Sequence, residues 1–138
     1  MSNLTRHQAR EITVQFLYQI DINKNSFENN LDNLREEHPK LNLEDGFLND
    51  ILIGTYQNIK EIDEIINKYT IDWNVSRMSK VDRNIIRLII YEILYQADIP
   101  LAVSINEGVE LAKSFSDEQS AKFINGVLAK VVDGLGLT

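Results

Sequence analysis

Apolar residues recur at helical spacing along almost the whole chain. Between Leu4 and about Ile22 they form one stripe, made by Ala9, Ile12, Phe16 and Ile20. This spacing predicts an amphipathic helix. Val14 and Tyr18 add a second apolar pair about half a turn away from the stripe. The helix is therefore either buried on two sides or offers its second side to a partner.

The next two predicted helices lie on either side of Pro39. A short helix is predicted around Phe27, Leu31 and Leu34, before the proline. Residues 44–70 then carry the clearest pattern in the chain, with core positions alternately four and three residues apart: Leu48, Leu52, Thr55, Ile59, Ile62, Ile66 and Tyr69. This heptad-like seam predicts one long helix that packs nearly antiparallel to its neighbours.

The segment after Ser79 is apolar on most of its sides. Ser79 has the position of an N-cap, and Asp82 lies in the first turn, where a carboxylate is favoured. The helix predicted from there, at about residues 80–98, carries these apolar residues: Ile85, Ile86, Leu88, Ile89, Ile90, Ile93 and Leu94. It is therefore predicted to be the central helix of a bundle.

Two further helices are predicted after Pro100. Each begins with a motif that matches a capping box: Ser104-Ile105-Asn106-Glu107 and Ser116-Asp117-Glu118-Gln119. The motifs predict helices at about residues 105–115 and 117–133.

Two glycine positions complete the prediction of the fold. Gly134 suits the end of the last helix. Asn125-Gly126 is a strong turn signal elsewhere, but here it is flanked by apolar residues at helical spacing, so it is placed inside the last helix. The predicted fold class is all-α, a helical bundle of about six to seven helices. Residues 1–138 are expected to form a single domain.

Composition narrows the class of protein. At 138 residues, with 43% apolar and 25% charged residues, the chain matches one soluble globular domain. The lack of cysteine excludes disulfides, cysteine-ligated zinc and thiol catalysis. No apolar run approaches the roughly 20 residues of a membrane helix, and the N-terminal segment lacks the apolar stretch of a signal peptide. A cytoplasmic protein with no membrane contact is expected.

Charge is unevenly distributed along the chain. The net charge of −7 argues against a surface coated with basic residues for nucleic acid. Residues 25–72 carry a balance of −7, whereas residues 73–91 carry +3. Any contact with a polyanion is therefore expected to be local.

The search for an enzyme is negative. The chain has no GxxxxGK[ST] loop, HExxH motif or GxSxG elbow. His7 lies beside Arg6 near the N-terminus and His38 precedes a proline, positions where a histidine is more often solvated than catalytic. No set of residues supplies the nucleophile, the base and the orienting group that catalysis needs. We expect neither an enzyme nor a metal or cofactor site.

The basic residues suggest RNA. Lys80, Arg83 and Arg87 share one helix face, and Arg6 and Arg10 share another near the N-terminus. Arginines near an aromatic ring suit single-stranded RNA, whose phosphates meet guanidinium groups and whose bases stack on rings. Arginines on a central helix also commonly pair with carboxylates of neighbouring helices, so spacing alone leaves both interpretations open.

Three blocks of sequence resemble the NusB family of bacterial transcription antitermination factors. The first is Arg6-x-x-x-Arg10-Glu11 with Gln15-Phe16-Leu17-Tyr18, and the second is Val81-Asp82-Arg83-x-Ile85-Ile86-Arg87-Leu88 leading into Tyr91-Glu92. The third and most specific contains Ile105-Asn106-Glu107-x-Val109-Glu110-Leu111-Ala112-Lys113-x-Phe115 and Lys122-Phe123-Ile124-Asn125-Gly126-Val127-Leu128. The resemblance covers residues 6 to 128.

The resemblance implies a helical bundle of two small subdomains without enzymatic activity. Proteins like this bind the boxA element of nascent ribosomal RNA leaders together with NusE, which is also a small-subunit ribosomal protein. The pair joins NusA, NusG and RNA polymerase in an antitermination complex. NusB-like domains also occur at the N-terminus of some RNA cytosine methyltransferases. The chain ends at Thr138, so a free-standing factor is the favoured interpretation.

The resemblance also implies roles for individual residues. Arg6, His7 and Arg10 match the family's basic N-terminal segment, and Lys113, Lys122 and Phe123 match its C-terminal blocks; these are RNA contacts by resemblance. Lys80, Arg83 and Arg87 are also assigned as RNA contacts. For the two arginines, ion pairs within the fold remain an open alternative. Phe123 is equally compatible with a core position, because either role buries a ring.

Tyr18 and Asp82 are assigned by the resemblance to a NusE-facing surface. An exposed tyrosine beside a carboxylate suits a basic protein partner. Two other interpretations stay open: a helical adaptor that binds protein without RNA, and a recognition domain for an RNA methyltransferase. The second apolar side of the first helix would also support a homodimer, and the sequence leaves monomer and homodimer open.

Overall fold

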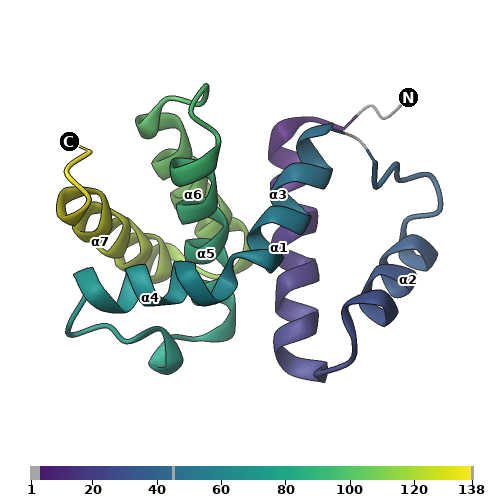
Figure 1. Cartoon of the computed structure of the whole chain (residues 1–138), viewed down its shortest axis with the longest axis horizontal. Helices are drawn as coiled ribbons and strands as arrows, with labels where there is room; N and C mark the ends of the chain where they lie inside the picture. The colour runs from purple at the N-terminus through teal and green to yellow at the C-terminus, as the bar shows by residue number, and fades with distance from the viewer. Residues whose placement is uncertain (1–3, 45, 138) are drawn as a thin grey trace.

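The computed structural model describes residues 4–44 and 46–137 (Figure 1). These residues form seven α-helices and one short 3-10 helix, and none of them belongs to a strand. The helices are α1 (Arg6–Asn23), α2 (Phe27–Glu37), α3 (Gly46–Gln57), α4 (Ile59–Tyr69), α5 (Lys80–Tyr95), α6 (Leu101–Phe115) and α7 (Glu118–Gly134), with the 3-10 helix η1 at Val75–Arg77. The predicted all-α bundle of six to seven helices is confirmed.

The helices gather into two groups that meet at α5. Helices α1, α2 and α3 lie on one side, and α4, α6 and α7 lie on the other (Figure 1). The central helix α5 packs against both groups, since it contacts α1 and α3 as well as α4, α6 and α7. Its middle is fully buried, at Ile85, Ile86, Leu88, Ile89 and Ile90. The prediction of a central helix is therefore confirmed.

Helix α1 begins at a capping box that the sequence analysis did not identify. Thr5 accepts a hydrogen bond from the backbone N–H of Gln8 (3.0 Å), and the Gln8 side chain accepts one from the backbone N–H of Thr5 (2.9 Å). The two residues on the second apolar side of α1 differ in burial, because Val14 is buried whereas Tyr18 is half-buried. The helix thus leaves a tyrosine partly exposed beside the core.

The predicted single helix over residues 44–70 is wrong, because α3 and α4 are separated at Asn58. The Asn58 side-chain amide donates to the carbonyl of Gly54 (2.7 Å), which a continuous helix would offer only to the backbone. The break directs α3 toward α1 and α4 toward α7. Ile62 and Ile66 are nevertheless fully buried, so the apolar seam is correct while the helix is not continuous.

The predicted caps of the last three helices have mixed outcomes. Ser79 caps α5 as predicted, accepting from the backbone N–H of Asp82 (3.1 Å). The Ser104 box is wrong, because α6 begins at Leu101, directly after Pro100. Proline already has the backbone φ that suits the start of a helix, and Ser104 lies buried inside α6.

The second predicted box is displaced by one residue. Asp117, not Ser116, caps α7 by accepting from the backbone N–H of Ser120 (2.8 Å). The placement of Asn125-Gly126 inside the last helix and of Gly134 at its end is confirmed.

Candidate nucleic-acid interface

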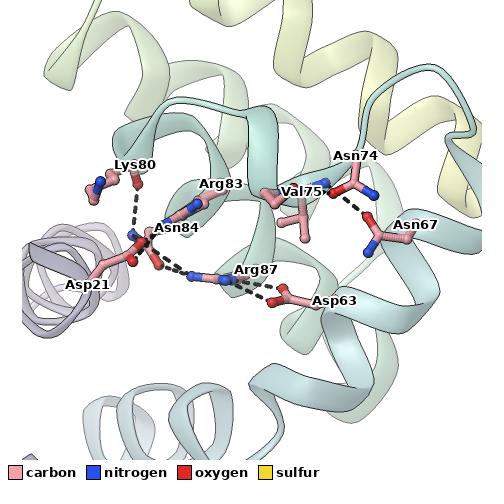
Figure 2. Close-up of polar contacts among 10 residues, drawn as sticks. Asp21, Asp63, Asn67, Asn74, Val75, Lys80, Arg83, Asn84 and Arg87 are labelled. Carbon is pink, nitrogen blue, oxygen red and sulfur yellow. Dashed lines mark hydrogen bonds and ion pairs between the residues drawn. The ribbon is translucent and has the colours of Figure 1, made fainter. Parts of the chain in front are cut away.

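The arginines of α5 are engaged in a polar network that joins three helices (Figure 2). Arg83 donates through Nε and Nη2 to the two carboxylate oxygens of Asp21 on α1 (2.7 and 2.5 Å). Arg87 donates in the same two-pronged manner to Asp63 on α4 (2.8 and 2.8 Å). Asn84 donates to Asp21 (3.0 Å) and accepts from Arg87 (3.0 Å), which links the two pairs.

This network is largely shielded from water, and the side chains of Arg83 and Arg87 are only 15% and 11% exposed. Burial opposes ionisation of Asp21, but the hydrogen bonds from Arg83 and Asn84 outweigh it and lower the pKa of that carboxyl. The hydrogen bond to Asp21 likewise raises the pKa of Arg83. Both guanidinium groups are therefore occupied by carboxylates of the same chain, which corresponds to the ion-pair alternative.

Arg10 is buried in a second network. It donates through Nε and Nη2 to the carboxylate of Glu92 (2.6 and 2.9 Å), whose side chain is 0% exposed. The Ser104 hydroxyl donates to the same carboxylate (3.1 Å). Glu107 lies 3.6 Å from Arg10 Nη1. The geometry gives Arg10 an internal partner and leaves its side chain only 4% exposed.

The other two residues of the basic N-terminal segment lie at the surface beside this network. His7 Nδ1 is 2.8 Å from Glu107 Oε2, and its Nε2 is 3.8 Å from Glu11. Arg6 is exposed and lies 3.8 Å from Asp98, with its guanidinium 4.7 Å from the ring centroid of Phe47. Arg6 is thus the accessible arginine of this segment.

The lysines form a different kind of surface at the start of α5 and α7. Lys80 and Lys122 are exposed, and neither has an ion-pair partner within residues 4–44 and 46–137. Ser120 donates to Asp82 (2.6 Å), which ties the first turn of α7 to that of α5. Lys80 and Lys122 therefore lie near the starts of two adjoining helices. We call Lys80, Lys122 and Phe123 the basic edge.

Phe123 and Lys113 differ from the two free lysines. Phe123 is half-buried and meets Trp73 edge to face, with ring centroids 5.7 Å apart. It therefore combines the core and surface positions that the sequence left as alternatives. Lys113 is exposed near the end of α6, where its Nζ lies 3.7 Å from Glu110. That pair is solvated and weak.

Tyr18 lies next to the basic edge. With Val14 on α1, Val81 on α5 and Phe115 on α6, it lines an apolar pocket of about 150 Å³. Asp82 follows Val81 directly and is half-buried. Tyr18 and Asp82, which the resemblance assigned to one surface, therefore lie on adjoining parts of the molecule.

The nine predicted RNA contacts do not form one continuous patch. Arg6 and His7 begin α1, whereas Asp21, which binds Arg83, is near the other end of that helix. Arg6 and Asp21 are fifteen positions apart, which corresponds to about 22 Å along α1. The basic edge and the N-terminal pair are thus two separate cationic positions, and Arg10, Arg83 and Arg87 are internal.

Sequence reasoning missed the residues that complete these networks. Glu92 was noted only as part of a motif, although a carboxylate inside an apolar helix signals a buried cation partner. Trp73 was not singled out, and its contact with Phe123 joins segments distant in the chain. In the part of the chain that the structure describes, no cluster of three histidine or acidic residues could hold a metal ion, and no helix is long and apolar enough to cross a membrane.

Comparisons with known proteins identify the family. The NusB family model matches residues 7–133. A transcription antitermination protein NusB from Desulforamulus reducens is 45% identical over 93% of this chain and 90% of that protein. The structure of T. maritima NusB matches with a TM-score of 0.80 and 30% identity over 96% of this chain and 93% of that one.

A crystal structure of the antitermination factors NusB and NusE in complex with dsRNA also matches. Its TM-score is 0.81, with 25% identity over 95% of this chain and 99% of that chain. The family model and the curated relative each cover more than nine-tenths of this chain, and the fold agrees with solved structures of the same family. The chain therefore belongs to the NusB family.

Proposed function

We propose that this chain is a transcription antitermination factor that binds the boxA element of nascent ribosomal RNA leaders together with NusE. Membership of the NusB family supports the proposal. One structural observation carries it: the hydrogen bond between Ser120 and Asp82 (2.6 Å) holds the basic edge beside the pocket that Tyr18 lines. A cationic surface suited to RNA thus adjoins a surface suited to a protein.

The RNA surface of the proposal is the basic edge, extended by Lys113 and, at a distance, by Arg6 and His7. Lys80 and Lys122 have charges that no carboxylate in the described chain neutralises, so phosphate binding breaks no internal ion pair. Phe123 provides a partly exposed ring on which a base can stack. Arg10, Arg83 and Arg87 act indirectly, by fixing the helices that carry this surface.

NusE is proposed to bind over Tyr18 and Asp82. The apolar pocket of about 150 Å³ offers a place for a partner side chain next to the Tyr18 ring. Asp82 accepts from Ser120 through Oδ1, and its other oxygen can accept from a basic residue of a ribosomal protein. This assignment gives the partly exposed tyrosine of α1 a protein partner rather than a second copy of the chain.

The mechanism is composite binding. A chain with a net charge of −7 binds RNA weakly through a few lysines. When NusE lies beside the basic edge, one RNA strand contacts both proteins, and each component strengthens the binding of the other. The ternary complex then joins RNA polymerase with NusA and NusG in the cytoplasm. The proposal treats residues 1–138 as one RNA-binding domain and includes no catalytic step.

A fluorescence anisotropy titration tests the proposal. A labelled single-stranded boxA-like RNA is titrated with the chain, with and without its cognate NusE, at two salt concentrations. We expect tighter and salt-dependent binding with NusE present, and weaker competition from an RNA of scrambled sequence or from a duplex. Binding of NusE without any RNA binding would leave a protein adaptor and refute the RNA assignment.

Two substitutions separate the surfaces. Tyr18→Ala is expected to weaken NusE binding by tenfold or more, as loss of a central aromatic anchor does, and to leave the weak RNA binding of the free chain unchanged. Lys122→Gln is expected to weaken RNA binding and spare NusE. If both variants impaired both partners equally, the two surfaces would not be distinct.

A further inference from the structure

A groove outside the proposed contacts lies between α7 and the segment that follows α4. Its volume is about 260 Å³, and it is lined by Tyr69, Thr70, Ile71, Asp72, Trp73 and Lys130. Ile71 at its rim is 86% exposed, the most exposed of the large apolar residues described. The groove combines two aromatic side chains, an apolar rim and a lysine, which are groups that ligand sites use.

One stripe of α7 packs against the two aromatic residues of this groove and leads from Lys130 to the basic edge. Phe123, Gly126, Lys130 and Gly134 are separated by three, four and four residues, so they lie on one face. A Cβ atom on Gly126 would lie 3.7 Å from Trp73, and one on Gly134 would lie 2.2 Å from Tyr69. The glycine at 134 therefore gives the Tyr69 ring its place against the helix.

The aromatic side of the groove is held in position by hydrogen bonds. The Trp73 backbone N–H donates to the Thr70 carbonyl (2.8 Å), and the Thr70 hydroxyl is bonded to the carbonyls of Ile66 (2.6 Å) and Trp73 (3.1 Å). Asn67 then accepts from the backbone N–H of Val75 (2.9 Å). A segment fixed in this way binds a ligand without a large loss of conformational entropy.

The charges around the groove fit a nucleotide. Lys130 is exposed and has no ion-pair partner among the described residues, and Lys68 Nζ lies 5.2 Å from the centroid of the Tyr69 ring. Two cations beside aromatic rings suit a phosphate and a stacked base. Asp72, on the groove wall, is an acceptor for the amino group of a base.

We propose that this groove binds unpaired bases of the same RNA strand that contacts the basic edge. The proposal rests on the proposed RNA-binding function and extends it to Tyr69, Trp73 and Lys130, which the family resemblance did not assign. Trp73 already touches Phe123, so the path is continuous. From Phe123 to Lys130 the helix rises about 10 Å, a distance that a short run of unpaired nucleotides spans.

Trp73 is the only tryptophan of the chain, so its fluorescence reports occupancy of the groove. A boxA-like single-stranded RNA of twelve or more nucleotides is added to the full chain with NusE, with the signal of NusE and RNA subtracted. End-label anisotropy is recorded on the same samples. We expect Trp73 emission to be quenched in parallel with the rise in anisotropy, because a stacked base quenches indole.

The two readouts distinguish failure of this inference from failure of the proposed function. A rise in anisotropy with unchanged Trp73 emission would overturn the groove proposal and leave RNA binding at the basic edge intact. No rise in anisotropy would overturn both. Shortening the RNA to the nucleotides that suffice for the basic edge is expected to abolish quenching before it abolishes binding.

Matched substitutions test the lysine and the ring. Lys130→Gln is expected to weaken RNA binding about threefold at 0.1 M salt and to lower the salt slope by about 0.7. Lys60→Gln, on the exposed side of α4, serves as the control and should have no effect. Trp73→Leu should weaken binding about tenfold, and Trp73→Phe should retain most of it. Equal affinities for Lys130→Gln and Lys60→Gln, with unchanged thermal melting, would refute the groove.

Discussion

The buried arginines and the lysines of the basic edge are all positively charged, but they differ in whether a carboxylate of the same chain pairs with them. Arg10, Arg83 and Arg87 each hold a carboxylate of another helix in a two-pronged contact of 2.5–2.9 Å. Lys80 and Lys122 meet no carboxylate in the part of the chain that the structure describes. The first set connects helices of one molecule, while the second is available to a ligand.

The partner of a cation therefore decides its role more than its place in a motif does. Four of the five residues lie in the blocks that resemble the family, Lys80 directly precedes one of them, and all five were predicted RNA contacts. The planar guanidinium suits a fixed two-pronged bond inside the fold, whereas the flexible, strongly hydrated ammonium of lysine suits the surface. The following predictions test whether the two sets are as separate as the contacts indicate.

The largest effect is expected from Arg10→Met. Loss of the guanidinium leaves Glu92, with a fully buried side chain, without its cation, which costs about 3–5 kcal/mol of unfolding free energy. For a domain of this size we expect the melting temperature to fall by roughly 10–20 °C. Urea and thermal denaturation followed by circular dichroism measure both quantities.

The control for this substitution is the double variant Arg10→Met with Glu92→Gln. Because it removes the unpaired charge and keeps an acceptor for Ser104, it should recover more than half of the lost stability. RNA affinity measured well below the melting temperature should match that of the parent chain. A folded Arg10→Met variant with strongly weakened RNA binding would place Arg10 among the RNA contacts and contradict its purely internal role.

The second prediction concerns pH. The pKa of Asp21 is lowered because hydrogen bonds from Arg83 and Asn84 outweigh burial. A carboxyl with a lowered folded pKa stabilises the fold fully above its unfolded value of about 3.9 and loses that contribution as pH falls toward the folded value. Asp21→Asn should therefore be less stable than the parent chain at pH 7, and the difference should shrink below about pH 4.

Asp32 provides the comparison for this experiment. It pairs with Arg35 at 3.2 Å, but both side chains are exposed (65% and 55%), and such pairs contribute little. Asp32→Asn should change the unfolding free energy by less than about 0.5 kcal/mol. A difference between the parent chain and Asp21→Asn that stays constant from pH 7 to pH 3 would contradict the assigned cause.

The sequence predicts helices that are defined by apolar burial, but it does not predict helix ends that depend on a single side-chain hydrogen bond. Apolar spacing located every helical segment and the central position of α5, because burial dominates there, although it merged α3 and α4 into one helix. It did not predict the break at Asn58, where the side chain donates to the Gly54 carbonyl (2.7 Å) and the helix ends although the apolar seam continues. It also placed Ser104 at a cap, because local sequence does not reveal that Glu92 on another helix takes its hydroxyl.

The candidate site was predictable in composition but not in geometry. Residue types and motif order pointed to RNA and to a protein partner. Arg83 and Lys80 lie one turn apart on the same helix but have different roles, because Arg83 is paired with Asp21. Asp21 lies 62 positions away from Arg83 in the chain. The contact between Trp73 and Phe123 is of the same kind. Long-range partners of this sort leave no pattern in a single sequence.

The third prediction tests the lysines directly. Lys80→Gln and Lys122→Gln should each weaken binding of single-stranded RNA about threefold near 0.1 M salt and lower the salt slope by about 0.7, since one phosphate contact is lost in each. Melting temperatures should not change, because neither lysine has an ion pair to lose. Lys40→Gln, in the exposed turn that follows α2, is the control. An equal loss in that variant would mean that general charge, not the basic edge, governs binding.

The smallest effect is expected at Lys113, which is neither buried in an ion pair like the arginines nor unpaired like Lys80 and Lys122. Its Nζ lies 3.7 Å from the Glu110 carboxylate in an exposed pair, so a phosphate must compete with that carboxylate. Lys113→Gln should weaken RNA binding less than twofold, and Glu110→Gln should strengthen it slightly by removing the competitor. The double variant should match Lys113→Gln, because the glutamate acts through the lysine. If neither single variant changed the affinity, Lys113 would lie outside the RNA path, and the path would follow α7 from Lys122 toward Lys130.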